Sequence, residues 1–248
     1  MTADVPDSHP RAASLRTRDR LVEGLDRGLT SRAGLIAHGR GEAFDYLLGE
    51  RTIPSADRAA RAAAAHLLAA DHPAISVNGN VAALATDLVV DLAEATDAAI
   101  EVNLFHRSAD RMAAIADHLR AHGASEVLGL AGDGRIPGLE HDRAICDADG
   151  IERADVVVVP LEDGDRAAAL DAMGKTEIVI DLNPLSRSAQ VADVPIVDNV
   201  VRALPAIAEH SRELAAEGDD PEGVIEAFDA SEAISDAERT IREGSLAE

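Results

Sequence analysis

The chain has 248 residues, 46% of them hydrophobic, and a formal net charge of -23 from 46 acidic and 23 basic side chains. This length is enough to bury a full hydrophobic core in one large domain. The acidic residues are spread along the whole chain, which argues against the basic face of a nucleic-acid-binding protein. We therefore expect small molecules, or a second copy of the chain, as partners.

The composition also indicates an environment. Lys175 is the single lysine, and aromatic residues make up only 2% of the chain. An acidic chain that uses arginine in place of lysine is typical of molar salt, where charge repulsion is screened beyond about 3 Å. An acidic protein from a low-salt organism is the alternative. Cys146 is the single cysteine, which excludes an internal disulfide, and no apolar run approaches the roughly 20 residues of a membrane span. We predict a reduced, cytoplasmic protein.

The first part of the chain is predicted to be helical. Residues 1–13 are polar and carry two prolines, so we expect a flexible N-terminus. Ser14 is a suitable N-cap for a helix that reaches about Arg27. An alanine-rich helix is predicted over residues 56–70.

Between these helices lies LIAHGRGEAFDYLLGER, residues 35–51. We expect a Gly-x-Gly turn at residues 39–41, followed by a short helix from Glu42 to Gly49. Such a turn exposes backbone N–H groups, and Arg40 adds a planar guanidinium. The motif therefore predicts an anion-binding site.

From Pro73 onward, short apolar runs alternate with helical stretches. The runs are residues 74–77, 99–105, 126–130, 155–161, 176–182 and 194–198. Continuous apolar strands separated by helices indicate a parallel sheet covered on both faces. We predict one Rossmann-like α/β domain over residues 14–208, with a helical part at 14–72 and an acidic helical extension at 209–248.

Ligands of open parallel sheets bind beyond the carboxyl ends of the strands, so the residues after each run are the candidates. Asn78, Gly79 and Asn80 follow the first run and form a cradle for a phosphate or carboxylate, although such residues are also common in ordinary turns. His106 and Arg107 follow the second run. These two side chains add potential cations at the same edge.

The third and fourth runs lead into less specific loops. Arg135 lies in a glycine-rich connection that does not match the G-x-G-x-x-G fingerprint, and a mobile loop is the alternative interpretation. Glu162, Asp163 and Asp165 follow the fourth run. They could bind a hydroxyl, an amine or a metal ion, or form a solvated loop.

The fifth and sixth runs end in dense polar segments. Pro184 disfavours a helical conformation for the residue before it, so the segment after the fifth run begins as a turn. Two neighbouring strand ends rich in Asp and Asn suit a purine base and a ribose. The polar residues are Asp181, Asn183, Ser186, Arg187 and Ser188 after the fifth run, and Asp198 and Asn199 after the sixth.

Lys175 lies in MGKT, which resembles the end of a phosphate-binding P-loop. The upstream glycine is missing, and the motif leads into a strand instead of a helix. Since every other fixed cation is arginine, a point charge at a phosphate is one interpretation, and a structural role is the other.

Several longer motifs occur in one order along the chain: GLIAHGRGEAFDYLLGE, ISVNGNVAAL, IEVNLFHR, IPGLEHDRA, ADVVVVPLEDGDR, MGK, and IDLNPLSRSA followed by IVDN. Together they resemble the archaeal phosphopantothenate synthetase family. The likeness runs from about Ser14 to about Leu204, and the tail after about Glu209 looks lineage-specific. The resemblance implies a homodimeric, ATP-dependent ligase of coenzyme A biosynthesis, here from a halophilic archaeon. It condenses 4-phosphopantoate with beta-alanine and releases AMP and diphosphate through an acyl adenylate.

The resemblance also implies site residues. ATP would be held by Arg18, Arg40, Asp181, Leu182, Asn183, Arg187, Ser188, Asn199 and Val200. From their positions after strands, and not from the resemblance, Asn78, Gly79, Asn80, Arg107 and Arg135 are assigned to phosphopantoate. The predicted catalytic group is Arg40, Lys175, Asn80 and His106, of which Asn80 and His106 are the candidates for beta-alanine. Mg²⁺ is expected to arrive bound to ATP, with no metal site in the protein.

Two other functions share parts of this pattern. A nicotinamide-dependent oxidoreductase would have the same layered sheet, but it should carry a G-x-G-x-x-G turn after the first strand. A non-catalytic nucleotide-sensing module would keep the nucleotide loops, but it has no use for extra cations at the neighbouring strand ends.

Overall fold

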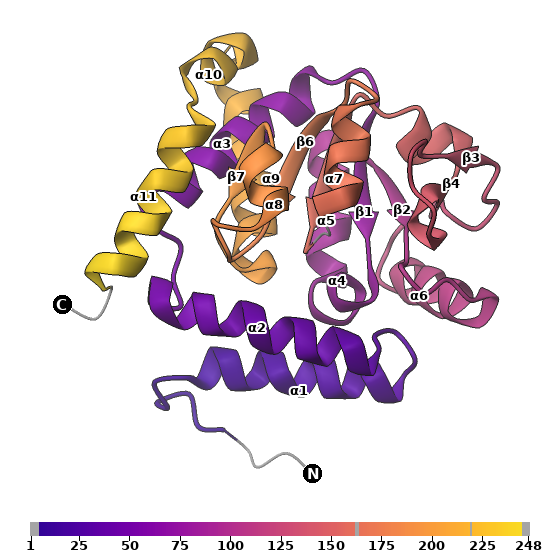
Figure 1. Cartoon of the computed structure of the whole chain (residues 1–248), viewed down its shortest axis with the longest axis horizontal. Helices are drawn as coiled ribbons and strands as arrows, with labels where there is room; N and C mark the ends of the chain where they lie inside the picture. The colour runs from indigo at the N-terminus through magenta and orange to yellow at the C-terminus, as the bar shows by residue number, and fades with distance from the viewer. Residues whose placement is uncertain (1–4, 162–163, 219, 245–248) are drawn as a thin grey trace.

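A central parallel sheet carries the fold of the chain (Figure 1). The computed structural model describes residues 5–161, 164–218 and 220–244, so Glu162 and Asp163 lie outside the described residues. Five strands pair in the order β2-β1-β5-β6-β7, and every pairing is parallel. The predicted Rossmann-like sheet is therefore confirmed. The strands are β1 Pro73–Val77, β2 Ala99–Val102, β5 Val156–Pro160, β6 Thr176–Ile180 and β7 Val194–Ile196.

Helices cover both faces of this sheet. Val158 points to a face covered by α3, α5 and α9, and its neighbour Val157 points to the opposite face, where α7 and a small ribbon lie. Both valines are fully buried. This two-sided burial explains why the strands read as continuous apolar runs. The helices named here are α3 Pro54–Ala69, α5 Thr86–Thr96, α7 Gly164–Asp171 and α9 Val200–Glu217.

The prediction of a strand at residues 126–130 is wrong. Leu128 makes only an isolated bridge to Glu101, and Gly129 has a φ of +96°. A side chain on Gly129 would clash with the carbonyl oxygen of Val102, so the backbone turns away there. The glycine-rich connection instead forms an antiparallel ribbon of β3 Gly134–Arg135 and β4 Ile145–Cys146, followed by the short helical turn η2 Ala148–Glu152.

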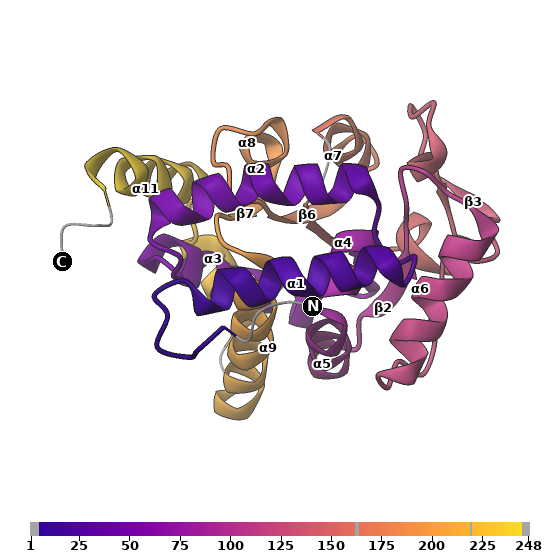
Figure 2. The same ribbon diagram turned by 90° about the horizontal axis from the view of Figure 1, so that it is seen from below.

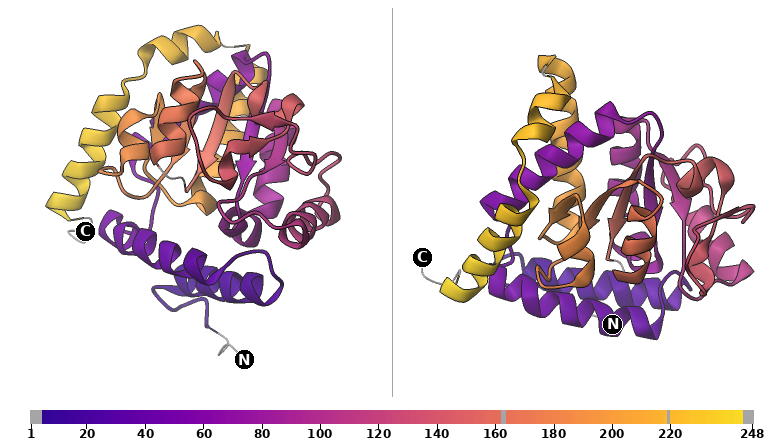
Figure 3. Two further views of the ribbon diagram at one scale, coloured as in Figure 1. Left: turned by 45° about the vertical axis from the view of Figure 1, so that its right-hand side comes forward. Right: turned by 45° about the horizontal axis from the view of Figure 1, so that its top comes forward.

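The C-terminal segment packs on the domain instead of standing apart from it. The expected boundary at residues 208 and 209 falls inside α9, which runs without a break from Val200 to Glu217. Helices α10 Pro221–Ala227 and α11 Ala230–Glu243 contact α3, and Ala237 is fully buried in the main core. Figure 3 shows α11 alongside the β7 side of the sheet.

The expected Gly-x-Gly turn is also wrong, because residues 39–41 lie inside a long helix. Helix α2 runs Arg32–Leu48, and the side chain of Ser31 caps it by accepting a hydrogen bond from Gly34 N at 3.2 Å. Its core-facing positions, which include Asp45 and Leu48, recur every three or four residues. The backbone N–H groups of this segment are therefore used within the helix and are not available to an anion.

Helix α2 and the antiparallel helix α1 Ala12–Asp26 lie together below the sheet (Figure 2). Both contact α4 Gly79–Leu84, which follows the carboxyl end of β1 directly. The helix pair therefore crosses the edge of the sheet at which the strands end. No helix in the described part of the chain is long and apolar enough to cross a membrane.

Replacement of two glycines in α2 tests the helical assignment. A methyl group on Gly39 meets nothing within 4 Å, whereas one on Gly34 clashes with the side chains of Asn80 and Thr30. Gly39→Ala should raise the free energy of unfolding by about 0.5–1 kcal/mol through helix propensity. Gly34→Ala should lower it by roughly 1–3 kcal/mol through overpacking. Urea unfolding followed by circular dichroism measures both changes. A destabilising Gly39→Ala would contradict the helix and support the turn expected from the sequence.

Candidate active site

The carboxyl ends of the strands bring most of the predicted site residues to one edge. Residues 78–80 follow β1, residues 105–107 follow β2, residues 181–188 follow β6, and residues 198–200 follow β7. The strand order switches sides between β1 and β5, since β2 lies on one side of β1 and the later strands lie on the other. Ligands of this kind of sheet bind at such a switch point.

The exit of β6 is a self-supporting polar turn. Asp181 Oδ1 accepts a hydrogen bond from Asn183 N at 2.9 Å, and Asn183 Oδ1 accepts one from Leu185 N at 3.0 Å. Ser186 Oγ accepts from Ala189 N at 3.1 Å and so caps the short helix α8 Arg187–Val191. The turn therefore holds its shape without a ligand.

Helix α2 meets this turn at Gly41, where a side chain would reach ordinary contact distance, 3.4 Å, from Leu182 Cδ1. Burial raises the pKa of Asp181, and the nearby charge of Arg40 opposes that rise. Arg40 itself is exposed. Arg40 thus lies near enough to the β6 exit for its charge to act on Asp181, and its side chain is exposed there.

The exit of β7 is bound to α2 by buried ion pairs. Arg202 on α9 donates from Nη2 to Asp45 Oδ1 at 2.5 Å and from Nε to Asp198 Oδ1 at 2.8 Å. Asp45 Oδ2 also accepts from Asn199 Nδ2 at 2.9 Å, and Thr52 Oγ1 donates to Asp198 Oδ2 at 2.6 Å. Asp45 and Asp198 are 4% and 1% exposed. Burial raises the pKa of Asp198, and Arg202 opposes the rise.

Asp45, Thr52 and Arg202 were not among the predicted site residues. One signal was present, because an acidic residue between Phe44 and Leu48 lies on the apolar side of an amphipathic helix. A charge at such a position normally has a buried partner. The identity of that partner could not be read from the sequence, since Arg202 lies 157 residues away.

The turn after β1 is held entirely by protein contacts. Asn78 caps α4 by accepting from Asn80 N at 3.0 Å, and its Nδ2 donates to Pro160 O of β5 at 2.9 Å. Asn80 Nδ2 donates to Gly34 O at 2.9 Å, and its Oδ1 accepts from Thr30 Oγ1. The two amides therefore clamp β5 and α2 onto the switch point. A side chain on Gly79 would clash with the carbonyl oxygen of Leu29.

The exit of β2 presents a guanidinium. Arg107 Nη2 donates to Gly129 O at 2.6 Å, and Arg107 N donates to Asp142 Oδ2 at 2.9 Å. Nη1 is buried and has no hydrogen-bond partner among the described residues. Such a donor suits an anion. His106, one residue earlier, is exposed.

Two buried carboxylates, those of Glu101 and Asp147, hold the loop that contacts Arg107. Glu101 on β2 accepts from Ile151 N at 2.6 Å and from Asp147 N at 3.2 Å, and burial raises the pKa of Glu101 to about 7. Asp147 in turn accepts from Gly129 N at 2.7 Å and from Gly132 N at 2.6 Å. The loop that receives the guanidinium of Arg107 is thus fixed to the sheet.

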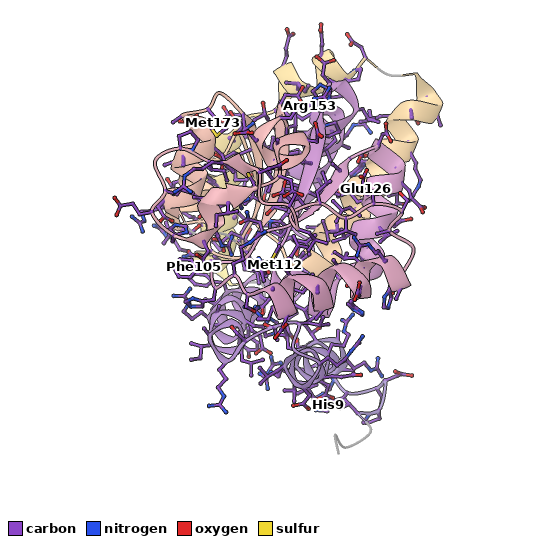
Figure 4. All side chains as sticks on the ribbon, turned by 90° about the vertical axis from the view of Figure 1, so that its right-hand side faces the viewer. His9, Phe105, Met112, Glu126, Arg153 and Met173 are labelled. Atoms are coloured by element: carbon purple, nitrogen blue, oxygen red, sulfur yellow. The ribbon has the colours of Figure 1, made fainter. Side chains whose placement is uncertain are left out.

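Lys175 does not reach this edge, so its predicted placement at the reacting centre is corrected. Lys175 precedes β6 and is 7% exposed; its Nζ donates to Glu152 O at 2.8 Å and Ala154 O at 2.5 Å. Arg135 N donates to Glu152 Oε1 at 3.1 Å. Lys175 therefore lies at the amino end of the sheet, whereas Arg135 is exposed on the β3–β4 ribbon, paired with Ile145, whose carbonyl accepts from Asn103 just after β2. Figure 4 labels Met173, two residues before Lys175, at the end opposite Phe105.

The remaining predicted nucleotide residues lie near the β6 and β7 exits or on α1. Arg18 on α1 pairs with Glu42 of α2 at 2.8 Å. Arg187 is exposed, Ser188 is buried, and Val200 is buried as the first residue of α9. A side chain on Gly164 would press on Arg187 Cβ, so α7 and α8 begin close together.

Two other kinds of site do not compete with the carboxyl edge: a metal site, and a cavity at the amino edge of the sheet. Among residues 5–161, 164–218 and 220–244, no three His, Cys, Asp or Glu side chains gather in a group that could hold a metal ion. A cavity of ≈ 480 Å³ lies at the amino edge, and its lining includes Asp71, Glu94, Asp97 and Asp149. Acidic walls disfavour an anionic ligand there.

Comparison with known proteins gives one family. The model of the family described as phosphopantothenate/pantothenate synthetase matches residues 55–244. A protein of Thermococcus onnurineus named 4-phosphopantoate–beta-alanine ligase is 54% identical over 244 residues, covering 96% of this chain and 92% of its own length. Proteins of the same name from Thermococcus kodakarensis and Methanosarcina mazei are 57% and 52% identical, over 85% and 97% of this chain and 81% and 95% of their own.

These matches correct the view of the C-terminal tail. The family model extends to residue 244 and therefore includes α10 and α11. The tail is a family feature, which agrees with its packing against α3.

The Asp45–Arg202 pair should hold α2 on the edge. Asp45→Ala removes an acceptor from both Arg202 and Asn199, and should lower the free energy of unfolding by about 2–3 kcal/mol. The matched control is Asp91→Ala, which removes a surface pair with Arg212 at 2.6 Å and should leave the urea midpoint nearly unchanged because solvent screens that pair. Equal midpoints for the two variants would contradict the assigned role.

Proposed function

We propose that this chain, which belongs to the phosphopantothenate/pantothenate synthetase family, condenses 4-phosphopantoate with beta-alanine and splits ATP to AMP and diphosphate. The observation that carries the proposal is the high identity, 52–57%, to proteins named for that ligation over 85–97% of this chain. Activation of the acid as an acyl adenylate accounts for both products. The site geometry supports this assignment independently.

The β6 and β7 exits form the proposed nucleotide half. Asp181 and Asn183 lie on the turn beside Arg40, and Asn199 lies at the neighbouring exit, fixed by Asp45. Carboxylate and amide groups can bind a ribose and a base, and the guanidinium of Arg40 can bind phosphate in a bidentate manner. The proposed group also includes Arg18, Leu182, Arg187, Ser188 and Val200.

The β1 and β2 exits form the proposed acid half. Arg107 has a buried, unpartnered Nη1 within the described structure, and phosphopantoate brings both a phosphate and a carboxylate. Gly79 lets the backbone of Leu29 pack closely on this turn, so it supports the edge and does not open it to a ligand. We assign Asn78 and Asn80 to holding this turn in place, because the contacts of their amides are already made within the protein.

The first chemical step joins two anions. A carboxylate must attack the α-phosphorus, so the residues around it have to neutralise charge on both partners. We propose that Arg40 does this from α2, above the boundary between the two halves. Proximity alone can contribute about 7–11 kcal/mol to such a condensation, so a covalent link to the enzyme is not required.

In this scheme Mg²⁺ would be bound by the phosphates of ATP and not by a protein site. The described acidic residues at the edge are occupied: Asp181 by its own turn, and Asp45 and Asp198 by Arg202. Mg²⁺ commonly binds through substrate phosphates with few protein ligands. His106 stays a candidate for the carboxylate of beta-alanine and Arg135 a candidate for phosphopantoate, whereas Lys175 is left out of the proposed site.

An assay of AMP release tests the function and the role of Arg40. In molar potassium chloride with ATP and Mg²⁺, AMP should form only when both 4-phosphopantoate and beta-alanine are present. Arg40→Ala should lower kcat/KM by about 100-fold or more, because a charge-stabilising donor is lost. Arg120→Ala, an exposed change on α6 Ala109–Ala121, is the control and should retain full activity. Nucleotide binding without AMP release would favour a sensing module.

We also infer a homodimer from the outward face of α2. Ile36 is 71% exposed, and Leu47, eleven residues further on the same stripe, is 44% exposed. Apolar side chains repeated along one exposed helix face indicate a protein contact, and the family resemblance makes a second copy the proposed occupant.

Light scattering should therefore give twice the chain mass, and Ile36→Glu should shift it toward the mass of one chain by placing a charge in the contact. Leu130→Glu changes a similarly apolar, exposed residue away from α2 and is the matched control. A monomeric parent protein would contradict the inference.

A further inference from the structure

His141 is held in one orientation between two strand exits. Its Nε2 lies 3.0 Å from Asp165 Oδ2, and its ring stacks on Phe105 with centroids 4.9 Å apart and planes at 27°. His141 lies on the loop after β3, Asp165 on the first turn of α7 and Phe105 after β2. Three separate segments therefore fix one imidazole.

The other ring nitrogen, His141 Nδ1, is buried and is left without a hydrogen-bond partner among the described residues. A carboxylate accepts but does not donate, so Asp165 favours the tautomer with the proton on Nε2. In that tautomer Nδ1 carries a lone pair. A carboxylate–imidazole pair with one unpartnered nitrogen is the arrangement of a general base.

The pair lies between the two halves of the proposed site. Gly164, next to Asp165, packs so closely on Arg187 of the nucleotide half that a side chain would not fit. Phe105 precedes Arg107 of the acid half by two residues. The charged and titratable groups placed by the structure around His141 are Asp165 on α7, Asp142 on its own loop, and His106 and Arg107 after β2.

The proposed ligation needs a base at this place. Beta-alanine is an alkyl ammonium in neutral solution, comparable with a lysine side chain of pKa about 10.4. An ammonium has no lone pair and cannot attack an acyl group. One proton must therefore leave the nitrogen before the amide bond can form.

We propose that His141 Nδ1 accepts this proton, and that Asp165 is a positioning residue that acts through His141. The freed amine attacks the acyl carbon of the adenylate, the C–N bond forms, and the C–O bond to AMP breaks with its electron pair leaving on the phosphate. The second nitrogen proton leaves as the amide forms and passes to the departing phosphate or to water. This inference rests on the proposed function and adds the proton acceptor to it.

The test separates the two half-reactions. Exchange of labelled diphosphate into ATP with 4-phosphopantoate measures adenylate formation, and AMP release with beta-alanine measures the complete ligation. Hydroxylamine, which is already neutral at pH 8, serves as a second nucleophile. His141→Gln should keep exchange and hydroxylamine trapping within about twofold of the parent, and should lower the rate with beta-alanine by about 100-fold or more.

The dependence on pH distinguishes a base from a structural residue. Without a base, the rate follows the free amine and should rise about tenfold per pH unit below the pKa of the ammonium, so the defect of His141→Gln should shrink between pH 8 and pH 10. Asp165→Asn should show the same selective pattern with a smaller loss, and covers the case in which His141→Gln does not fold. His210→Gln is the matched control, because His210 pairs with Asp57 at 3.1 Å on the surface.

The outcomes are distinct. Absence of diphosphate exchange in the parent protein would overturn the proposed function itself. Exchange in the parent, together with variants that lose both nucleophiles equally, lose exchange as well, or lose nothing, would overturn the role of His141 and leave the ligase assignment standing.

Discussion

Arg202 stands between Asp45 of α2 and Asp198 after β7, and both carboxylates are almost completely buried. Charges taken out of water are costly unless each has a partner, so the three groups fix one another's position. Helix α2 otherwise rests on the edge through few apolar residues, since its buried members in the described structure are Asp45 and Leu48. The docking of α2, and with it the approach of Arg40 to the β6 exit, therefore depends on this buried cluster.

A second set of buried carboxylates positions a cation at the β2 exit. Glu101 fixes Asp147, and Asp147 fixes the loop that receives Arg107. In each case an acidic side chain is buried and satisfied by N–H donors or a guanidinium, and a cation is left directed to the edge. A chain with twice as many acidic as basic residues thus uses part of its acidity internally, to position the few cations that two anionic substrates require.

The sequence predicts the parts of this fold that depend on local pattern. The β5 and β6 strands were recognisable because a strand buried on both faces is continuously apolar, and Asn78 was placed correctly because it follows a strand and precedes a helix. Lys175 could have been excluded on the same logic, since a residue before a parallel strand lies at the amino edge. The helix predicted from Glu42 to Gly49 is the second half of α2. Its first half was missed because glycines at 39 and 41 suggest a turn, whereas the cap at Ser31 and the core contacts make residues 32–41 helical. The partners of Asp45 and of His141 lie on distant segments, and no local pattern encodes them.

The net charge of -23 also bears on how the site can work. At low ionic strength the acidic surface repels ATP and phosphopantoate over tens of ångströms, because the Debye length is about 30 Å at 0.01 M salt. Molar salt shortens that range to about 3 Å and removes most of the repulsion. The carboxylates of Asp45 and Asp198 are almost completely buried, so their contacts with the partly buried Arg202 are screened far less. High salt therefore acts differently on the two groups of acidic residues. It screens the surface charges that oppose substrate entry, and it has little effect on the buried carboxylates that hold α2 against the sheet.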